Sequence, residues 1–202
     1  MKCLITVVNS KIKRRENNMG FDLTGLNPNL TRPEPELPPM VERTSEHWEI
    51  YTDWQEENCG TYFRNNVWGW RPLWNFVTAM CNDFLTEKDI EQGYYNDGHK
   101  ISKTKAGKIA KKLYNLIEKG DVEAYESAYK RNLASLEQIY CDICDATGKR
   151  QKPPETGAGD MECNGCNGTG KKDAWAKSYP FSVDNVRQFA NFCANSGGFE
   201  IH

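Results

Sequence analysis

The stretch YFRNNVWGWRPLW, residues 62–74, brings together three of the six tryptophans of this 202-residue chain, two arginines and two adjacent asparagines. Burial of so much aromatic surface favours a core junction that joins a strand to the helix after it. If residues 68–70 are extended, Trp68 and Trp70 lie on one face of the segment and Arg71 on the other. Pro72 is then well placed as the first residue of the following helix.

Downstream of this junction, apolar residues recur at the i, i+3, i+4, i+7 spacing of a helix. The spacing predicts helices over residues 72–85, 109–117, 122–136 and 183–193, with Ser182 as the N-cap of the last. Strand signals are weaker, and the best are WEIYT at 48–52 and FEI at 199–201. The chain is therefore expected to be α+β and predominantly helical.

Charge and hydropathy exclude some classes of function. The formal net charge is −2, so there is no global basic field of the kind that drives nonspecific nucleic-acid binding. No apolar run approaches the roughly 18–20 residues that cross a bilayer, and LITVV at 4–8 is shorter than a signal h-region. We expect a soluble, cytoplasmic protein that does not contact a membrane.

Composition also divides the chain along its length. Five of nine prolines lie in residues 25–46, and acidic residues dominate 34–57, whereas Lys100–Lys119 holds seven lysines against one glutamate. Met19 offers an alternative start. The expected segments are a disordered or non-native extension at 1–18, a Pro-rich extended arm at 19–46, a mainly helical domain at 47–140, a small zinc-ribbon-like segment with four cysteine ligands at 141–172, and a C-terminal helix and short strand at 173–202 that pack back on the helical domain.

The strongest chemical signal is a repeat, CDICDATGKR at 141–150 and CNGCNGTGKK at 163–172. Eighteen residues separate Cys144 from Cys163, inside the interval of about 15–20 at which two Cys-x-x-Cys pairs close one zinc site. Without an export signal these thiols are expected to remain reduced. We predict that Cys141, Cys144, Cys163 and Cys166 hold one structural zinc ion, rather than forming two unrelated thiol turns or a redox pair.

Residues around the cysteines fit this prediction. Glycines follow the second cysteine of each pair and relieve steric limits where the chain turns back on the metal. Four thiolates leave a zinc centre formally −2, which nearby basic side chains can offset. The residues in question are Gly148, Gly168 and Gly170, and Lys149, Arg150, Lys171 and Lys172.

Two resemblances extend this interpretation. CNGCNGTG is similar to the Cys-x-x-Cys-x-Gly-x-Gly unit of the zinc-binding region of DnaJ-type co-chaperones, which implies zinc geometry; a His-Pro-Asp tripeptide is absent, so chaperone function is not implied. YFRNNVWGWRPLW, with YYNDGH at 94–99 and NVRQFANFCANSGGFEI at the C-terminus, resembles an uncharacterised family of phage and prophage proteins. That resemblance implies a viral or mobile-element origin and a protein of the host-cell cytoplasm, and such accessory proteins are often counter-defence factors.

The polar members of the opening run raise the question of a ligand. Buried guanidinium and amide groups need partners, and arginine stacked on tryptophan suits a base or a phosphate. In the turn at 94–99, Asp97 could neutralise an arginine, and a lone His99 is more often solvent-exposed than functional. The candidate ligand-binding residues are Arg64, Asn65, Asn66, Trp68, Trp70, Arg71, Asp97 and His99; no catalytic residue is assigned.

Three functions stay open on this evidence. The first is a non-enzymatic, zinc-stabilised phage accessory protein that binds a host protein or a small nucleotide-like anion. The second is an enzyme acting on a nucleotide or phosphorylated substrate, although no P-loop or nucleophile motif occurs. The third is a zinc protein that binds nucleic acid through the lysine-rich helix. Self-association into a homo-oligomer is open in each.

Overall fold

The computed structural model describes residues 20–202, which form two compact units. Unit 1 contains residues 20–126 and 181–202, and unit 2 contains residues 127–180. The extension expected at 1–18 lies outside the described residues.

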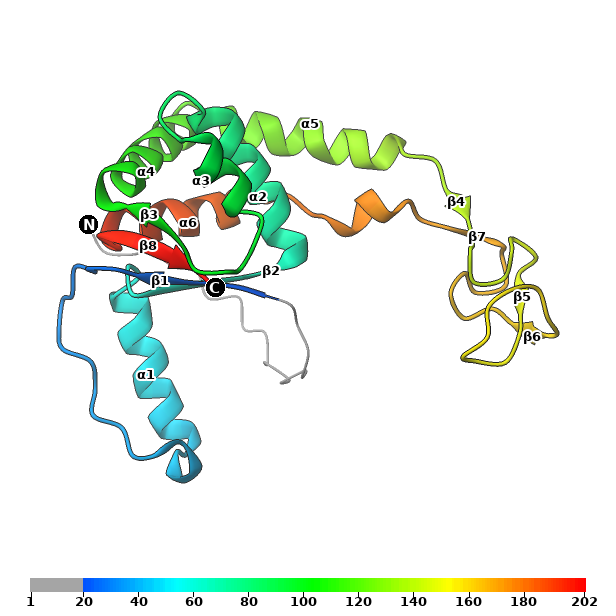
Figure 1. Cartoon of the computed structure of the whole chain (residues 1–202), viewed down its shortest axis with the longest axis horizontal. Coiled ribbons are helices and arrows are strands. Elements are labelled where there is room, and N and C mark those ends of the chain that lie inside the picture. The colour runs from blue at the N-terminus through cyan, green and yellow to red at the C-terminus, as the bar shows by residue number, and fades with distance from the viewer. Residues whose placement is uncertain (1–19) are drawn as a thin grey trace. The chain divides into compact units, whose positions relative to one another are not determined.

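Unit 1 is built on a four-stranded antiparallel sheet with the strand order β2-β1-β8-β3 (Figure 1). The strands are β1 (Gly20–Gly25), β2 (Tyr62–Asn66), β3 (His99–Ser102) and β8 (Gly198–Ile201). The C-terminal strand was expected. The arm expected at 19–46 differs at its start, because residues 20–25 form a central strand that pairs with β2 on one side and β8 on the other.

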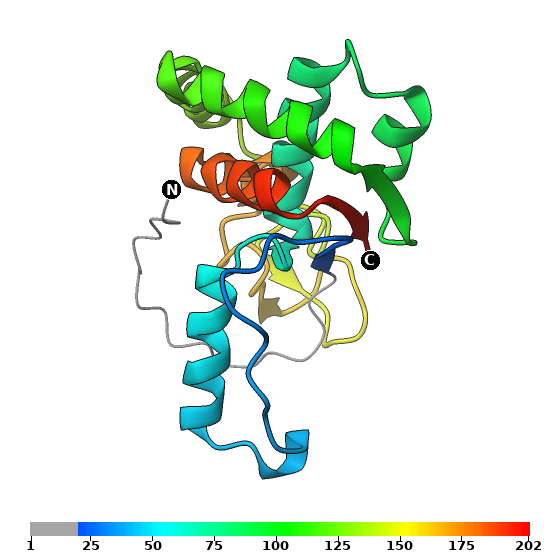
Figure 2. The same ribbon diagram turned by 90° about the vertical axis from the view of Figure 1, so that its left-hand side faces the viewer.

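One face of the sheet packs against the hydrophobic core of unit 1. Alternate residues of each strand are buried, as the two-residue period of a strand requires. Helices α2 (Val67–Cys81), α4 (Lys103–Glu118) and α6 (Val183–Asn195) cover this face (Figures 1 and 2). The buried strand residues are Phe21, Leu23, Phe63, Ile101, Phe199 and Ile201.

The aromatic run forms the predicted junction, but with a different backbone. Trp70 and Trp74 are fully buried and stack on each other, and Phe21 of β1 stacks on Trp70. Residues 68–70 are helical, and the helix start expected at Pro72 is wrong: α2 begins at Val67, where the Asn66 side chain accepts a hydrogen bond from the Gly69 N–H. That N-cap starts the helix five residues before Pro72, which lies inside it.

The strand expected at 48–52 is also wrong, since these residues lie in helix α1 (Ser45–Glu57). Thr44 and His47 form a reciprocal capping box that starts the helix. Residues of the Pro-rich arm run beside α1 and hold it: the Trp54 indole N–H donates to the Arg32 carbonyl at 3.1 Å, and Arg32 pairs with Glu57 at 2.7 Å. The arm contains one short helix, η1 (Met40–Glu42).

The remaining elements complete an α+β fold that is predominantly helical, as predicted. Helices α3 (Glu87–Gln92) and α5 (Asp121–Ser135) follow α2 and α4 in the chain, α6 packs on α4, and Ser182 caps α6. Unit 2 carries two small ladders, β4 (Ile139–Tyr140) with β7 (Lys171–Lys172) and β5 (Lys149–Arg150) with β6 (Met161–Glu162), and η2 (Trp175–Ser178). Within residues 20–202, no helix combines the length and apolar character needed to cross a membrane.

Candidate metal centre

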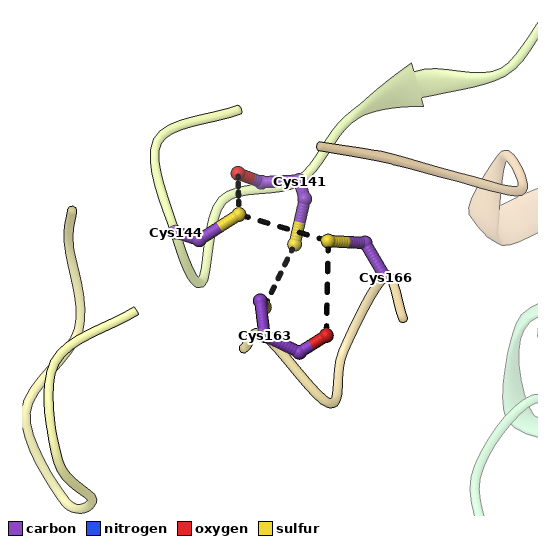
Figure 3. A group of neighbouring side chains, drawn as sticks. All are labelled: Cys141, Cys144, Cys163 and Cys166. Carbon is purple, nitrogen blue, oxygen red and sulfur yellow. Dashed lines mark hydrogen bonds between the residues drawn. The ribbon is translucent and has the colours of Figure 1, made fainter. Parts of the chain in front are cut away.

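The two Cys-x-x-Cys pairs meet in unit 2 and form a buried cluster of four free thiols (Figure 3). Their four Sγ atoms all lie within 4.8 Å of one another. Cys141 Sγ is 3.8 Å from Cys163 Sγ, and Cys144 Sγ is 3.7 Å from Cys166 Sγ. A sulfur tetrahedron around an ion at about 2.3 Å has edges of about 3.8 Å, so this set fits one tetrahedral metal ion.

The sequence repeat is also a repeat of backbone geometry. In each pair a later amide donates to the first cysteine carbonyl: Ala146 to Cys141 at 2.9 Å, and Gly168 to Cys163 at 3.1 Å. The two turns then bond to each other, because Cys141 N–H donates to the Gly170 carbonyl and Cys163 N–H to the Gly148 carbonyl, both at 2.9 Å. Each turn therefore positions the first cysteine of the other.

Two glycines are required where the turns approach each other. A Cβ at Gly148 would lie 2.1 Å from the Gly168 carbonyl oxygen, and a Cβ at Gly170 would lie 2.1 Å from that of Ala146. Both glycines also have positive φ, 77° and 74°. Ala146, which stands where the second turn has Gly168, is itself left-handed at φ 62°, a conformation that costs an alanine roughly 1 kcal/mol.

The charge of the cluster depends on whether it holds a cation. Burial raises the pKa of the Cys144 thiol, since a charged sulfur is poorly solvated there. A metal ion among the four sulfurs removes this penalty and holds all four as thiolates. Of the basic residues expected to offset the charge, Lys172 pairs with Asp142, and Arg150 donates to the Asn164 side chain at 2.9 Å; Lys149 and Lys171 are exposed.

The candidate ligand-binding residues have different environments in unit 1. Trp70 is buried and donates to the Gly93 carbonyl, Asn66 caps α2, and Asn65 donates to the Asn185 side chain at 2.7 Å. Trp68 is half-buried, and Arg71 and Asp97 are exposed. The polar groups of Trp70, Asn65 and Asn66 therefore have hydrogen-bond partners within unit 1.

Arg64 borders a cavity. Its guanidinium lies 3.5 Å from the Asp22 carboxylate, so Asp22, and not Asp97, is the acidic partner of Arg64. The Tyr62 hydroxyl donates a hydrogen bond to the same carboxylate. Burial and this hydrogen bond raise the pKa of Tyr62 to about 12. Arg64 and Tyr62 line a cavity of about 240 Å³ together with Gln188 and Asn191 of α6.

His99 occupies a different environment from the exposed turn expected for it. It lies on β3, 11% exposed, and its Nε2 is 3.0 Å from Asp89 of α3. Asp89 is buried and also receives Lys105 of α4 and both the amide and hydroxyl of Thr86. Sequence analysis missed Asp89 and Lys105; the Thr86-x-x-Asp89 capping box was the available signal for α3.

Both oxygens of the Asp89 carboxylate meet partners, which come from β3, α4 and the start of α3. Burial by itself would raise the Asp89 pKa, but the bonds from Lys105, Thr86 and His99 outweigh it and lower that pKa. The Asp89 cluster therefore joins α3, α4 and β3 through ion pairs and hydrogen bonds.

Comparisons of this chain with known protein families, with curated protein sequences and with solved structures find no match. The site is consequently defined by its own geometry: a buried four-cysteine cluster that accommodates one metal ion.

Proposed function

We propose that this chain is a zinc-stabilised, non-enzymatic phage accessory protein that binds a host protein, in the role of a counter-defence factor. The observation that carries the zinc assignment is the arrangement of the four sulfurs, because the Sγ–Sγ distances of 3.7 and 3.8 Å match a tetrahedron with zinc–thiolate bonds of about 2.3 Å. Thiolates favour a borderline-soft ion such as Zn²⁺ over Mg²⁺ or Ca²⁺.

A structural role for the ion follows from the number of its ligands. Four sulfurs fill every position of a tetrahedral zinc ion, so none remains for a water or a substrate. The hydrophobic core around the site is also small, because it consists of the four cysteines and the partly buried Ile143 that packs against them. The ion thus supplies the stability that a segment of short ladders lacks.

A host protein is the partner that the surface of unit 1 suits better than a nucleotide-like anion. Arg64 is already paired with Asp22 and Trp70 is in the core, so neither offers a free stacking or anion site. The arm of unit 1 instead exposes Met40 (70%) and Val41 (93%) on η1, among acidic residues. An exposed apolar pair of this kind suits insertion into an apolar pocket of a partner. The resemblance to phage and prophage proteins supplies the viral setting.

The zinc assignment is tested by X-ray absorption at the zinc edge. The spectrum should give four sulfur ligands at about 2.3 Å, because every ligand in the cluster is a cysteine. Oxygen or nitrogen ligands would reveal an open, reactive site instead.

The partner assignment is tested with a matched pair of variants. A host protein captured from cells should bind again as a purified pair, and Val41→Asp should abolish that binding. The control Leu30→Asp places the same charge on another exposed apolar residue of the arm and should leave binding unchanged. Equal binding by the Val41 variant would contradict the assigned surface.

A further inference from the structure

Unit 1 carries an acidic helix and a basic groove that do not meet within the chain. Figures 1 and 2 show α1 on the side of the four-stranded sheet opposite to α4. Helix α1 contains acidic residues and no lysine or arginine, and α4 contains five lysines and one acidic residue, Glu118. Opposite charges have therefore been placed on two separate surfaces of the same molecule.

The acidic surface is a stripe along one face of α1. Glu46, Glu49 and Asp53 follow the i, i+3, i+7 spacing that aligns side chains on one face, and all three are exposed. Ile50 lies beside this stripe and is 41% exposed. Trp54, one turn after Ile50, is the buried residue that anchors α1 to its own arm. The exposed stripe thus combines carboxylates with an apolar side chain.

The basic surface is a groove along α4 of about 850 Å³. Phe84, Ala110 and Tyr114 are among its lining residues, and a Cβ at Gly107 would meet open space. Lysines line the groove, and Lys108 lies over the Phe84 ring at 5.5 Å. The lining lysines are Lys108, Lys111 and Lys112, and they outnumber the two lining carboxylates, Asp83 and Glu118.

We propose that the α1 stripe of one copy docks in the α4 groove of a second copy, so that the protein forms a reciprocal dimer. Carboxylates at 46, 49 and 53 would face the groove lysines, while Ile50 would cover part of the apolar lining. Because each copy carries both surfaces, a two-fold axis makes the contact twice and closes the assembly. The contact depends on exposed charges and should weaken as salt screens them.

Sedimentation velocity of the full chain, supported by native mass spectrometry, tests the dimer. At low salt the expected species has twice the chain mass of 23.1 kDa, and it should dissociate at high salt. The sample is treated with nuclease and its absorbance at 260 nm is checked, so that a bridging nucleic acid would be recognised. A monomer at low salt, or a dimer lost on nuclease treatment, would overturn the proposal.

A charge exchange tests the assigned surfaces. Lys111→Glu/Lys112→Glu and Glu49→Lys/Asp53→Lys should each weaken self-association roughly tenfold or more, because each places like charges across both contacts. An equimolar mixture of the two variants places opposite charges across both contacts of each mixed pair, with the sign reversed at one of them, and should form a heterodimer. The control Lys88→Glu/Lys152→Glu changes the net charge as much as the first variant does, at exposed lysines outside the groove, and should dimerise like the natural chain.

Each outcome of the exchange is decisive for the surface. Variants that dimerise as tightly as the natural chain would place the interface elsewhere, and a mixture that stays monomeric would exclude the α1–α4 pairing. Circular dichroism of every variant excludes misfolding as the cause of a lost dimer. A monomer in which α1 cross-links to α4 of its own chain would likewise overturn the proposal.

Discussion

Asp89 offers the most direct test of how unit 1 is held together. Its carboxylate is buried and receives Lys105, His99 at 3.0 Å, and the Thr86 amide and hydroxyl at 2.9 and 2.6 Å. Asp89→Asn keeps the shape but removes the charge, and its amide group has one oxygen where the carboxylate has two. At least one donor loses its acceptor.

The expected cost follows from the exposure of those donors. A hydrogen bond to a charged group contributes about 1.5–3 kcal/mol, but the Lys105 side chain is 27% exposed, so water replaces part of what it loses. We expect Asp89→Asn to lower the free energy of unfolding of unit 1 by about 2 kcal/mol. For a unit of this size that corresponds to roughly 6–10 °C in Tm.

The pH dependence identifies the carboxylate as the cause. The bonds from Lys105, Thr86 and His99 outweigh burial and lower the Asp89 pKa in the folded state, so its stabilisation is complete above the unfolded value of about 3.9 and is lost as pH falls below it. The difference between the natural chain and the variant should therefore be full at about pH 6 and shrink from about pH 4 downwards.

Urea titration followed by the fluorescence of the buried Trp70 and Trp74 measures this difference in unit 1. The control Asp97→Asn removes an exposed carboxylate and should change the free energy of unfolding by less than about 0.5 kcal/mol. If Asp89→Asn changes the free energy of unfolding equally little, or if its effect persists unchanged into acid, the Asp89 carboxylate does not stabilise unit 1 as described.

Three further substitutions test other parts of the fold. Gly170→Ala should abolish metal retention, since its Cβ would lie 2.1 Å from the Ala146 carbonyl oxygen. Ala146→Gly should raise resistance to chelators, because glycine adopts the left-handed backbone at this position without the cost that alanine has. Competition with a chromogenic chelator measures both effects. Asn66→Ala removes the N-cap of α2 and should lower the free energy of unfolding by about 1 kcal/mol in urea titrations, with Asn82→Ala, at the other end of the helix, as the comparison. Gly93→Ala would place a Cβ 2.1 Å from the Trp74 ring and should shift the tryptophan emission of the folded protein, and an unchanged spectrum would contradict the packing described.

Short-range signals predicted the parts of this protein that short segments determine. The spacing of the cysteine pairs was enough to predict the cluster, because each turn is set by its own short repeat and the glycines within it. The apolar period likewise predicted α2, α4, α5 and α6, and a serine before the last helix predicted its cap at Ser182.

Features that depend on contacts between distant parts of the chain could not be predicted from short segments of sequence. WEIYT has the composition of a strand, but the capping box at Thr44 and the support of the arm make it part of α1. Strand β1 pairs with β2 and with β8 at the far end of the chain, so nothing local distinguishes it. The Asp89–His99 contact joins two elements whose pairing becomes visible only in the folded sheet.

The metal content of the purified chain shows whether the four cysteines hold zinc. Elemental analysis combined with native mass spectrometry, on protein expressed without added metal, should give one zinc ion per chain, retained by the natural chain and lost from Cys163→Ser/Cys166→Ser. A natural chain whose unit 1 is folded but which carries no zinc, or carries its zinc independently of these cysteines, would contradict the account.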